Sequence, residues 1–600
     1  MADQQTPIPA SNYVVRDPEA FALNMARAAE ALGKAAAAWL EPRERGEVVD
    51  EPNATATDMV ETLNKVAMHF ITDPRLAIDA QTKIMSRGFE LWSESLARMS
   101  GISHDIKVKD RRFADEDWTE NPLFDFLRRA YSTTVDLSQE LVLDAENLDH
   151  ETREKAKFYV EQVAAALSPS NFLLTNPAAL KKTVESNGEN LVQGFQMLAE
   201  DLERGRGNLK LRQADGSNFE LGRNIAVTPG RVVARNALCE IIQYEAQTDE
   251  VLKRPLVIVP PWINKFYILD LNEDKSFIDW AVKRGHTVFV ISWAQPDERH
   301  AQMDWSDYAR DGIDFALNTA ATATGENAFN AIGYCVGGTL LAANLALHVK
   351  RGDERIASVT LFTTQVDFEH AGDLKVFVNE EQLRALERKM ERKGYLDGGE
   401  MATAFNMLRA RDLIWSTVVN NYMMGKTPPA FDLLHWNSDS TRMSAANHSY
   451  YLRNCYLNNA LTQGTMELDG EKLDLSAVRI PVYNLATRED HIAPTRSVYE
   501  GSKAFGGDVT YVMSGSGHIA GVVNPPAKKK YQFWTGPAPS TDMSFEEWVE
   551  HAEETSGSWW EHWQAWIEGH DEKRVKAREV GGGKLAPMDE APGLYVRVKA

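Results

Sequence analysis

Six short and continuously apolar runs follow one another after about residue 220, and they constrain the fold more than any other feature of the chain. Unbroken apolar strands are typical of parallel sheets that helices cover on both faces. Helical stretches separate most of the runs, so the sequence predicts an alternating α/β sheet. The runs span residues 256–260, 288–292, 329–333, 358–363, 481–486 and 509–513.

The region before these strands reads as helical. Asp17-Pro18-Glu19 combines an N-cap residue with a proline at the first helical position, and Pro42 is expected to end that helix. We predict an all-α domain over residues 1–215 and a second domain over 216–600. One face of the first helix, which either packs within its own domain or docks a partner or an apolar particle, is predicted to carry Phe21, Met25, Ala28, Leu32, Ala35 and Trp39.

Length, charge and cysteine content exclude several classes of protein. A chain of 600 residues is expected to form more than one domain, and 43% hydrophobic with 25% charged residues is typical of globular proteins. A formal net charge of −22 argues against nucleic-acid binding. Three cysteines form no disulfide framework, which favours a reducing cytoplasm. Neither a signal peptide nor a membrane-spanning apolar run is expected.

The stretch Gly333-Tyr334-Cys335-Val336-Gly337 has the G-x-S-x-G spacing of a nucleophile elbow, with cysteine in place of serine. A strand before it and a helix after it supply the required flanks, and this indicates an α/β-hydrolase fold. At a helix N-terminus, the dipole would favour the Cys335 thiolate. The alternative interpretation is a buried structural cysteine. Cys239 and Cys455 lack these flanks.

A nucleophile of this kind needs a general base and an orienting acid, which follow it in that fold in the order acid, then base. Asp490 comes directly after the run 481–486, and His518 comes directly after 509–513. Loops that follow parallel strands meet at one edge of the sheet. We therefore predict a Cys335–His518–Asp490 triad, with His491 as the rival base and Glu489 as the rival acid.

Backbone N–H groups are expected to form an oxyanion hole beside the nucleophile. One donor should be Val336, directly after Cys335. The other should come from the loop VPPWINKFYILDL (259–271), where Ile263 is favoured and Trp262 is the next choice.

More than a hundred residues separate the runs 358–363 and 481–486, although other neighbouring strands are closer together. The gap contains helix-like and aromatic-rich sequence. We predict an inserted cap over about 367–461 that covers the carboxyl edge of the sheet. The alternative is a structural insertion away from the site.

Several motifs resemble those of the class I polyhydroxyalkanoate synthases, also called poly(3-hydroxyalkanoate) polymerases. They extend over nearly the whole chain, and the first hundred residues match least distinctively. The motifs are GYCVGGT, PPWINKFYILDL, REDHIAP, GSGHIAGVVNPPAKKK, FDLLHWNSDST, SWWEHWQAW, EAPGLYVRVKA, DRRF, NPLFD and SNFLLTNP.

This resemblance implies an acyltransferase that polymerises (R)-3-hydroxyacyl-CoA, with 3-hydroxybutyryl-CoA the expected monomer, into a storage polyester. CoA would be the leaving group, with no cofactor or metal. The resemblance assigns the nucleophile to Cys335, the acid to Asp490 and the base to His518. It also implies a cytoplasmic homodimer at polymer granules, with granule-coat proteins as further candidate partners. It assigns no separate role to Asp270 or Trp436.

A cysteine nucleophile suits this chemistry. Transfer from CoA to Cys335 exchanges one thioester for another and is nearly thermoneutral, whereas onward transfer to a hydroxyl gives an oxygen ester and is downhill. A serine acyl-enzyme would lose that difference. The alternative functions are a cysteine-dependent thioesterase or polyester hydrolase and a non-catalytic granule-binding protein.

Overall fold

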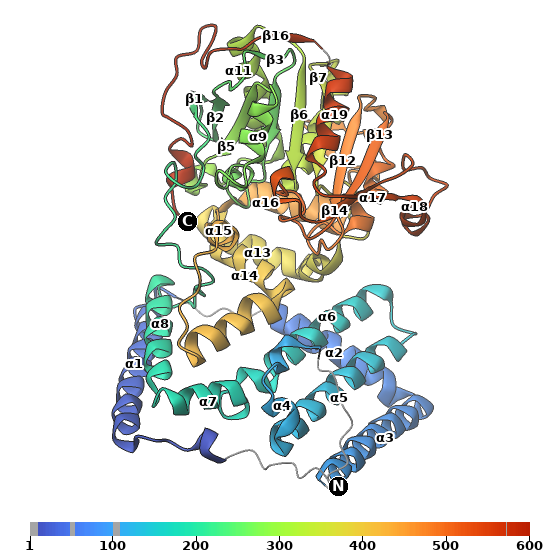
Figure 1. Ribbon diagram of the computed structural model, residues 1–600. Coiled ribbons are helices and arrows are strands. Elements are labelled where there is room, and N and C mark those ends of the chain that lie inside the picture. The colour runs from blue at the N-terminus through green and yellow to red at the C-terminus, as the bar shows by residue number, and fades with distance from the viewer. Residues whose placement is uncertain (1–9, 49–53, 100–108, 572) are drawn as a thin grey trace. The chain divides into compact units, whose positions relative to one another are not determined.

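The computed structural model describes residues 10–48, 54–99, 109–571 and 573–600. The prediction that the chain has no signal peptide concerns mainly residues 1–9, which lie outside the described residues. The chain forms two compact units (Figure 1). Unit 1 consists of Met1–Asp215 and Phe405–Ala430, and unit 2 consists of Gly216–Ala404 and Phe431–Ala600.

Unit 1 is helical, as predicted. A segment from far along the chain completes it, because the π-helical turns η9 (Arg411–Trp415) and η10 (Val418–Met423) belong to this unit. The main helices are α1 (Pro18–Glu44), α2 (Ala54–Thr72), α3 (Pro74–Met99), α4 (Asp117–Glu120), α5 (Pro122–Asp144), α6 (His150–Ala166), α7 (Pro177–Glu185) and α8 (Glu189–Arg204).

Helix α1 packs against α8 through small side chains. Ala28 clusters with Leu191, and Ala35 clusters with Leu202. The Asp17 side chain accepts a hydrogen bond from the Ala20 N–H and caps the helix, as its position before Pro18 predicts. Alanine at the contact positions lets the two backbones approach closely.

The predicted face of α1 is buried only in part. Ala28 and Ala35 are at most 3% exposed, whereas Leu32 is 47% and Trp39 44% exposed. Helix α8 packs at the alanine positions. The predicted end at Pro42 is wrong, because the helix continues to Glu44.

Unit 2 is built on a ten-stranded sheet with the order β1-β2-β5-β4-β6-β7-β12-β13-β14-β15. The six strands from β5 to β13 in that order pair in parallel, and antiparallel strands flank them on both sides. The strands are β1 (Gly230–Arg235), β2 (Cys239–Tyr244), β4 (Leu256–Val259), β5 (Val288–Trp293), β6 (Phe329–Tyr334), β7 (Ile356–Phe362), β12 (Val482–Thr487), β13 (Val509–Ser514), β14 (Gln532–Thr535) and β15 (Glu553–Ser556).

All six predicted strands are confirmed as the parallel core of this sheet, and the sequence reasoning missed the four antiparallel strands. Helices α9 (Phe277–Lys283) and α19 (Trp560–His570) cover one face. Because the core strands are parallel, the loops after β4, β6, β12 and β13 all leave from the same edge. That edge carries every residue of the predicted active site.

The tryptophans of SGSWWEHWQAW contact the loop after β13. Trp559, Trp560 and Trp563 are at most 1% exposed. The indole N–H of Trp559 donates to the carbonyl of Gly521, and that of Trp560 donates to Val522, both at 2.9 Å. The cluster is therefore a structural one that holds the loop after β13.

The insertion between β7 and β12 is not one piece. Phe405–Ala430, within the range predicted as a cap, belongs to unit 1 and leaves the remainder in unit 2. That remainder contains α13 (Glu380–Lys393), α15 (Asp432–Ser438), α16 (Ala445–Tyr451) and the π-helical turn η11 (Leu452–Leu457).

No helix in the described part of the chain combines the length and the apolar character that a membrane crossing requires.

Candidate active site

Cys335 lies in a strained turn between β6 and helix α12 (Val336–Arg351). Its backbone has φ = 52° and ψ = −127°, a region that side-chain-bearing residues rarely adopt. The Cys335 N–H donates to the Phe362 carbonyl at 2.9 Å, which ties the turn to β7. Such strain persists only where the surroundings hold it, and it often marks a functional site.

Three glycines allow this turn to form. A Cβ at Gly333 would lie 2.4 Å from the Gly338 Cα, and one at Gly337 would lie 2.5 Å from the Pro260 carbonyl oxygen. A Cβ at Gly338 would lie 2.0 Å from the Thr364 hydroxyl. These three glycines therefore allow close packing of β6, α12 and the loops after β4 and β7.

Asp490 and His518 are brought together across two neighbouring loops. One oxygen of Asp490, Oδ2, lies 2.7 Å from His518 Nδ1 and accepts from the Thr487 hydroxyl at 3.0 Å. The other, Oδ1, accepts from the N–H groups of Ile492 and Ala493 at 2.8 and 2.9 Å. The carboxylate is thus fixed at both oxygens, and it holds the imidazole by Nδ1.

Charge on the neighbouring groups favours the protonated form of His518. Burial lowers the pKa of His518, but the charges of Asp490 and Cys335, together with hydrogen bonds to both, outweigh burial and raise it to about 10. The Tyr334 ring stacks on the imidazole with a centroid distance of 5.8 Å, and its hydroxyl donates to the His518 carbonyl at 3.2 Å. A carboxylate and a sulfur thus both favour the protonated form of this imidazole.

The rival residues are placed differently. Glu489 is exposed, with its backbone N–H donating to the Ser516 carbonyl at 2.9 Å. His491 is half-buried beside Asp490 in the chain. The hydrogen bonds that fix the Asp490 carboxylate come from His518, Thr487, Ile492 and Ala493.

The other two thiols differ from Cys335, which is partly exposed. Burial raises the pKa of Cys239, with nearby carboxylates adding to the rise, and burial alone raises the pKa of Cys455 well above its usual value. Both side chains are fully buried. Neither is suited to form a reactive thiolate.

The predicted oxyanion donors lie at the start of α12 and in the loop after β4. Val336 is the first residue of α12, where an N–H group has no acceptor within the helix. Ile263 is 7% exposed. The Trp262 ring packs in a buried aromatic cluster, 5.1 Å from Tyr308 and 6.0 Å from Trp305 between ring centroids.

The insertion contributes an aromatic wall whose residues the sequence analysis did not name. Burial raises the pKa of Tyr451 and Tyr456, and the charge of Cys335 adds to the rise, so both phenols lie within electrostatic reach of the thiol. Tyr456 packs against Phe368 with a centroid distance of 4.9 Å and against Tyr451 at 5.5 Å. In the sequence, the aromatic-rich stretch YYLRNCY (450–456) could have indicated these residues.

Asp270 and Trp436 both support the loop after β4. Asp270 is buried and accepts from the hydroxyls of Thr228 and Ser276 at 2.5 and 2.8 Å. The Trp436 indole donates to the Lys265 carbonyl at 2.8 Å. These contacts are structural.

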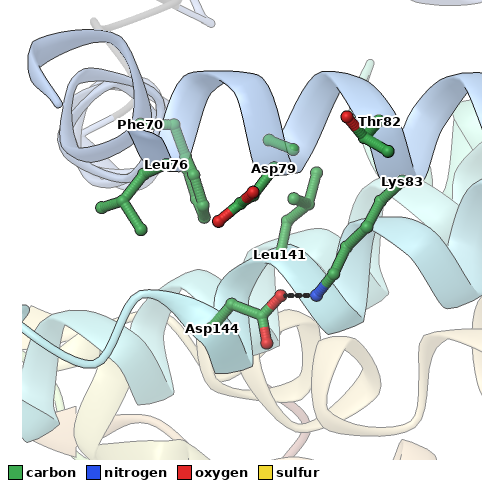
Figure 2. A pocket seen from close by; sticks show the side chains of 8 residues that line it. Phe70, Leu76, Asp79, Thr82, Lys83, Leu141 and Asp144 are labelled. Atoms are coloured by element: carbon green, nitrogen blue, oxygen red, sulfur yellow. Dashed lines mark hydrogen bonds and ion pairs between the residues drawn. The ribbon is translucent and has the colours of Figure 1, made fainter. Parts of the chain in front are cut away.

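A pocket in unit 1 contains none of the predicted catalytic residues. Figure 2 shows it lined by side chains of α2, α3 and α5, among which Lys83 pairs with Asp144. Among the described residues, no group of three or more His, Cys, Asp and Glu side chains is arranged to hold a metal ion. The expectation that catalysis needs no cofactor stays a prediction.

Two family descriptions match the chain. The family described as poly-beta-hydroxybutyrate polymerase (PhaC) N-terminus matches residues 109–281. The family described as alpha/beta hydrolase fold matches residues 255–525. The second match contains Cys335, Asp490 and His518.

Individual relatives match over almost the full chain. The poly(3-hydroxyalkanoate) polymerase subunit PhaC of Rhizobium meliloti is 61% identical over 98% of this chain and 96% of its own length. The poly(3-hydroxyalkanoate) polymerase of Methylorubrum extorquens is 53% identical over 98% and 99%. The subunit PhaC of Cupriavidus necator is 38% identical over 94% and 95%. The chain therefore belongs to the poly(3-hydroxyalkanoate) polymerase family, and it is an acyltransferase that forms polyhydroxyalkanoate.

Proposed function

We propose that this polymerase joins (R)-3-hydroxyacyl-CoA monomers through a thioester on Cys335, with (R)-3-hydroxybutyryl-CoA as its principal substrate. The observation that carries the proposal is a partly exposed thiol on a strained turn, at a helix N-terminus, on the same sheet edge as an imidazole that a buried carboxylate holds. CoA is the leaving group, and no cofactor takes part.

The first step transfers the acyl group to sulfur. The Cys335 thiolate attacks the thioester carbonyl, and the N–H groups of Val336 and Ile263 stabilise the oxyanion that forms. The bond from carbon to the CoA sulfur then breaks, and His518 gives its proton to the departing CoA thiolate. The products are free CoA, a Cys335 thioester and a neutral imidazole.

The second step transfers the acyl group to a hydroxyl. Acylation removes the charge of Cys335, one of the contributions that raise the pKa of His518 against the lowering effect of burial. The pKa of His518 therefore falls, which favours the neutral imidazole, and this imidazole takes the proton of the incoming 3-hydroxyl as that oxygen attacks the thioester. The ester forms, the Cys335 thiolate leaves, and the imidazolium–thiolate pair is restored. Asp490 holds the imidazole in both steps.

Water must be kept from the thioester, because hydrolysis would end the chain. We assign this role to the aromatic wall of Tyr451, Tyr456 and Phe368, in which the charge of Cys335 acts on both phenols. The same wall distinguishes the proposed polymerase from a thioesterase of the same fold, which needs water at the acyl-enzyme.

The direct test of this function is a product analysis. Purified protein is incubated with (R)-3-hydroxybutyryl-CoA, and free CoA, free 3-hydroxybutyrate and insoluble polyester are measured. A polymerase with this substrate releases CoA and deposits polyester. Release of CoA with an equal amount of free acid would instead identify a thioesterase.

The pH dependence of the reaction should change in Asp490→Asn. Burial lowers the pKa of His518, and the charge of Asp490 is the largest of the contributions that raise it to about 10. The imidazolium is present below its pKa and is lost as pH rises through it. Without that charge the pKa falls, so we expect the alkaline limb of the CoA-release profile to move to lower pH. A limb that stays in place would show that His518 does not control it.

We further propose that the protein acts as a homodimer on cytoplasmic polyester granules and attaches to the polymer through the outer face of α3. Large apolar side chains repeat along that face at spacings of three, four and seven residues, and each is 43–67% exposed. This apolar stripe consists of Ile78, Met85, Phe89, Trp92 and Leu96.

The double variant Phe89→Ser/Trp92→Ser should bind purified polyester granules at least about tenfold more weakly, because burial of each such side chain contributes about 1.5–3 kcal/mol. CoA release in the absence of granules should stay within twofold of wild type. Val349→Ser/Val549→Ser removes two side chains of unit 2 that are 43% and 42% exposed, and it serves as the control in the same sedimentation assay. Equal binding by the two variants would exclude the stripe as the attachment surface.

A further inference from the structure

The loop after β4 is fixed through its carbonyl groups by one segment of the insertion. The single hydroxyl proton of Thr441 is shared between the carbonyls of Trp262 and Ile263, the latter at 2.7 Å. The Trp436 indole donates to the Lys265 carbonyl at 2.8 Å. Segment 436–441 therefore binds three carbonyls within four consecutive residues of the loop.

The contact with the Trp262 carbonyl also sets the direction of the next N–H group. Among the described residues, the cis peptide bond lies at Ala591–Pro592, so the peptide between Trp262 and Ile263 is trans. In a trans peptide the C=O and N–H bonds point in opposite directions. With its C=O directed at Thr441, this peptide must direct the Ile263 N–H away from segment 436–441.

A second set of contacts, which does not involve Thr441, anchors the far end of the loop. The Lys265 ammonium group donates to Asp439 at 2.9 Å and to the carbonyls of Val596 and Val598 at 2.7 and 2.9 Å. Tyr267 donates to the same carboxylate at 2.9 Å. Loss of the Thr441 hydroxyl would therefore release the carbonyls of Trp262 and Ile263 while Lys265 and Tyr267 keep the far end of the loop anchored.

We propose that Thr441 is a positioning residue for acyl transfer, whose buried hydroxyl aims the Ile263 N–H at the developing oxyanion. The proposal rests on the function proposed above. Both the acylation of Cys335 and the transfer to a hydroxyl pass through such an oxyanion, so a misdirected donor slows both steps. The Cys335–His518 pair is untouched, because its contacts lie in other loops.

Thr441→Val tests this proposal, because it removes the hydroxyl and nearly keeps the volume. We expect kcat for CoA release from (R)-3-hydroxybutyryl-CoA to fall about 10- to 100-fold, less than the roughly 100- to 1,000-fold cost of deleting an oxyanion donor. KM should stay within about twofold. Alkylation of Cys335 by iodoacetamide, which forms no oxyanion, should keep its wild-type rate. Thr441→Ser should restore most of the turnover.

Thr319→Val is the matched control, since Thr319 is 4% exposed and donates to a backbone carbonyl in α11 (Phe315–Thr324), as Thr441, 7% exposed, does in the loop. If Thr441→Val does not fold, Thr441→Ala removes the same hydroxyl and takes its place. Turnover near wild type, or parallel losses in turnover and in Cys335 alkylation, would overturn the proposal. If wild-type protein itself released CoA without making polyester, the proposed function would fail instead.

Discussion

Cys335→Ala is expected to reduce CoA release to the background rate while the protein stays folded. Cys239 and Cys455 cannot replace it, because both are fully buried and burial raises the pKa of each thiol. Cys335→Ser should also be severely impaired, since a hydroxyl is far less acidic than a thiol. Chromatographic measurement of free CoA checks the rate, and circular dichroism checks the fold.

The control is Cys239→Ala, which removes a thiol outside the site and should leave turnover per folded molecule close to wild type. Substantial turnover by well-folded Cys335→Ala would refute the assignment of the nucleophile. A large loss in both variants would point to a general effect of removing thiols on the fold.

His518→Ala is expected to lower kcat by about 10²–10⁴-fold, the usual cost of removing a general base. His491→Ala should cost less than about tenfold, because His518 is the imidazole that the buried Asp490 carboxylate holds at 2.7 Å. Steady-state CoA release by the two folded variants measures this difference. His518→Ala should also slow the alkylation of Cys335 at neutral pH, because it removes the imidazolium paired with the sulfur.

The opposite order of the two losses would mean that the base lies in the loop after β12 and that the pairing of Asp490 with His518 is structural. Equal and small losses would mean that neither histidine moves the proton in the rate-limiting step.

The parallel core of the sheet could be predicted because its strands are buried on both faces and therefore read as unbroken apolar runs. The antiparallel additions give weaker signals. Strand β15 (Glu553–Ser556) is exposed along its whole length, so it carries no apolar pattern. It forms only because its backbone pairs with β14 (Gln532–Thr535).

The placement of the site residues followed from topology. Cys335, Asp490 and His518 each come directly after a parallel strand, and the ends of such strands share one edge. The contacts of the insertion could not be predicted in the same way. Tyr456 and Thr441 reach the site through tertiary packing across more than a hundred residues of sequence, which no local period encodes.

The division of the insertion between the two units could not be predicted from the sequence either. Gly194 in α8 lies so close to η10 that an added Cβ would be 2.1 Å from the Tyr422 carbonyl oxygen. The Tyr422 hydroxyl donates to the buried Asp201 at 2.7 Å. The sequence around Gly194 and Asp201 does not indicate that these two residues of α8 contact Tyr422, which lies more than two hundred residues later.

The central claim is that the growing chain is carried as a thioester on Cys335. Acid quenching during turnover of (R)-3-hydroxybutyryl-CoA, followed by peptide mapping by mass spectrometry, tests it most directly. We predict 3-hydroxybutyryl units on the peptide that contains Cys335, removed by neutral hydroxylamine, as thioesters are. Acyl groups on another residue, or a Cys335 peptide that stays unmodified while polyester accumulates, would contradict the account.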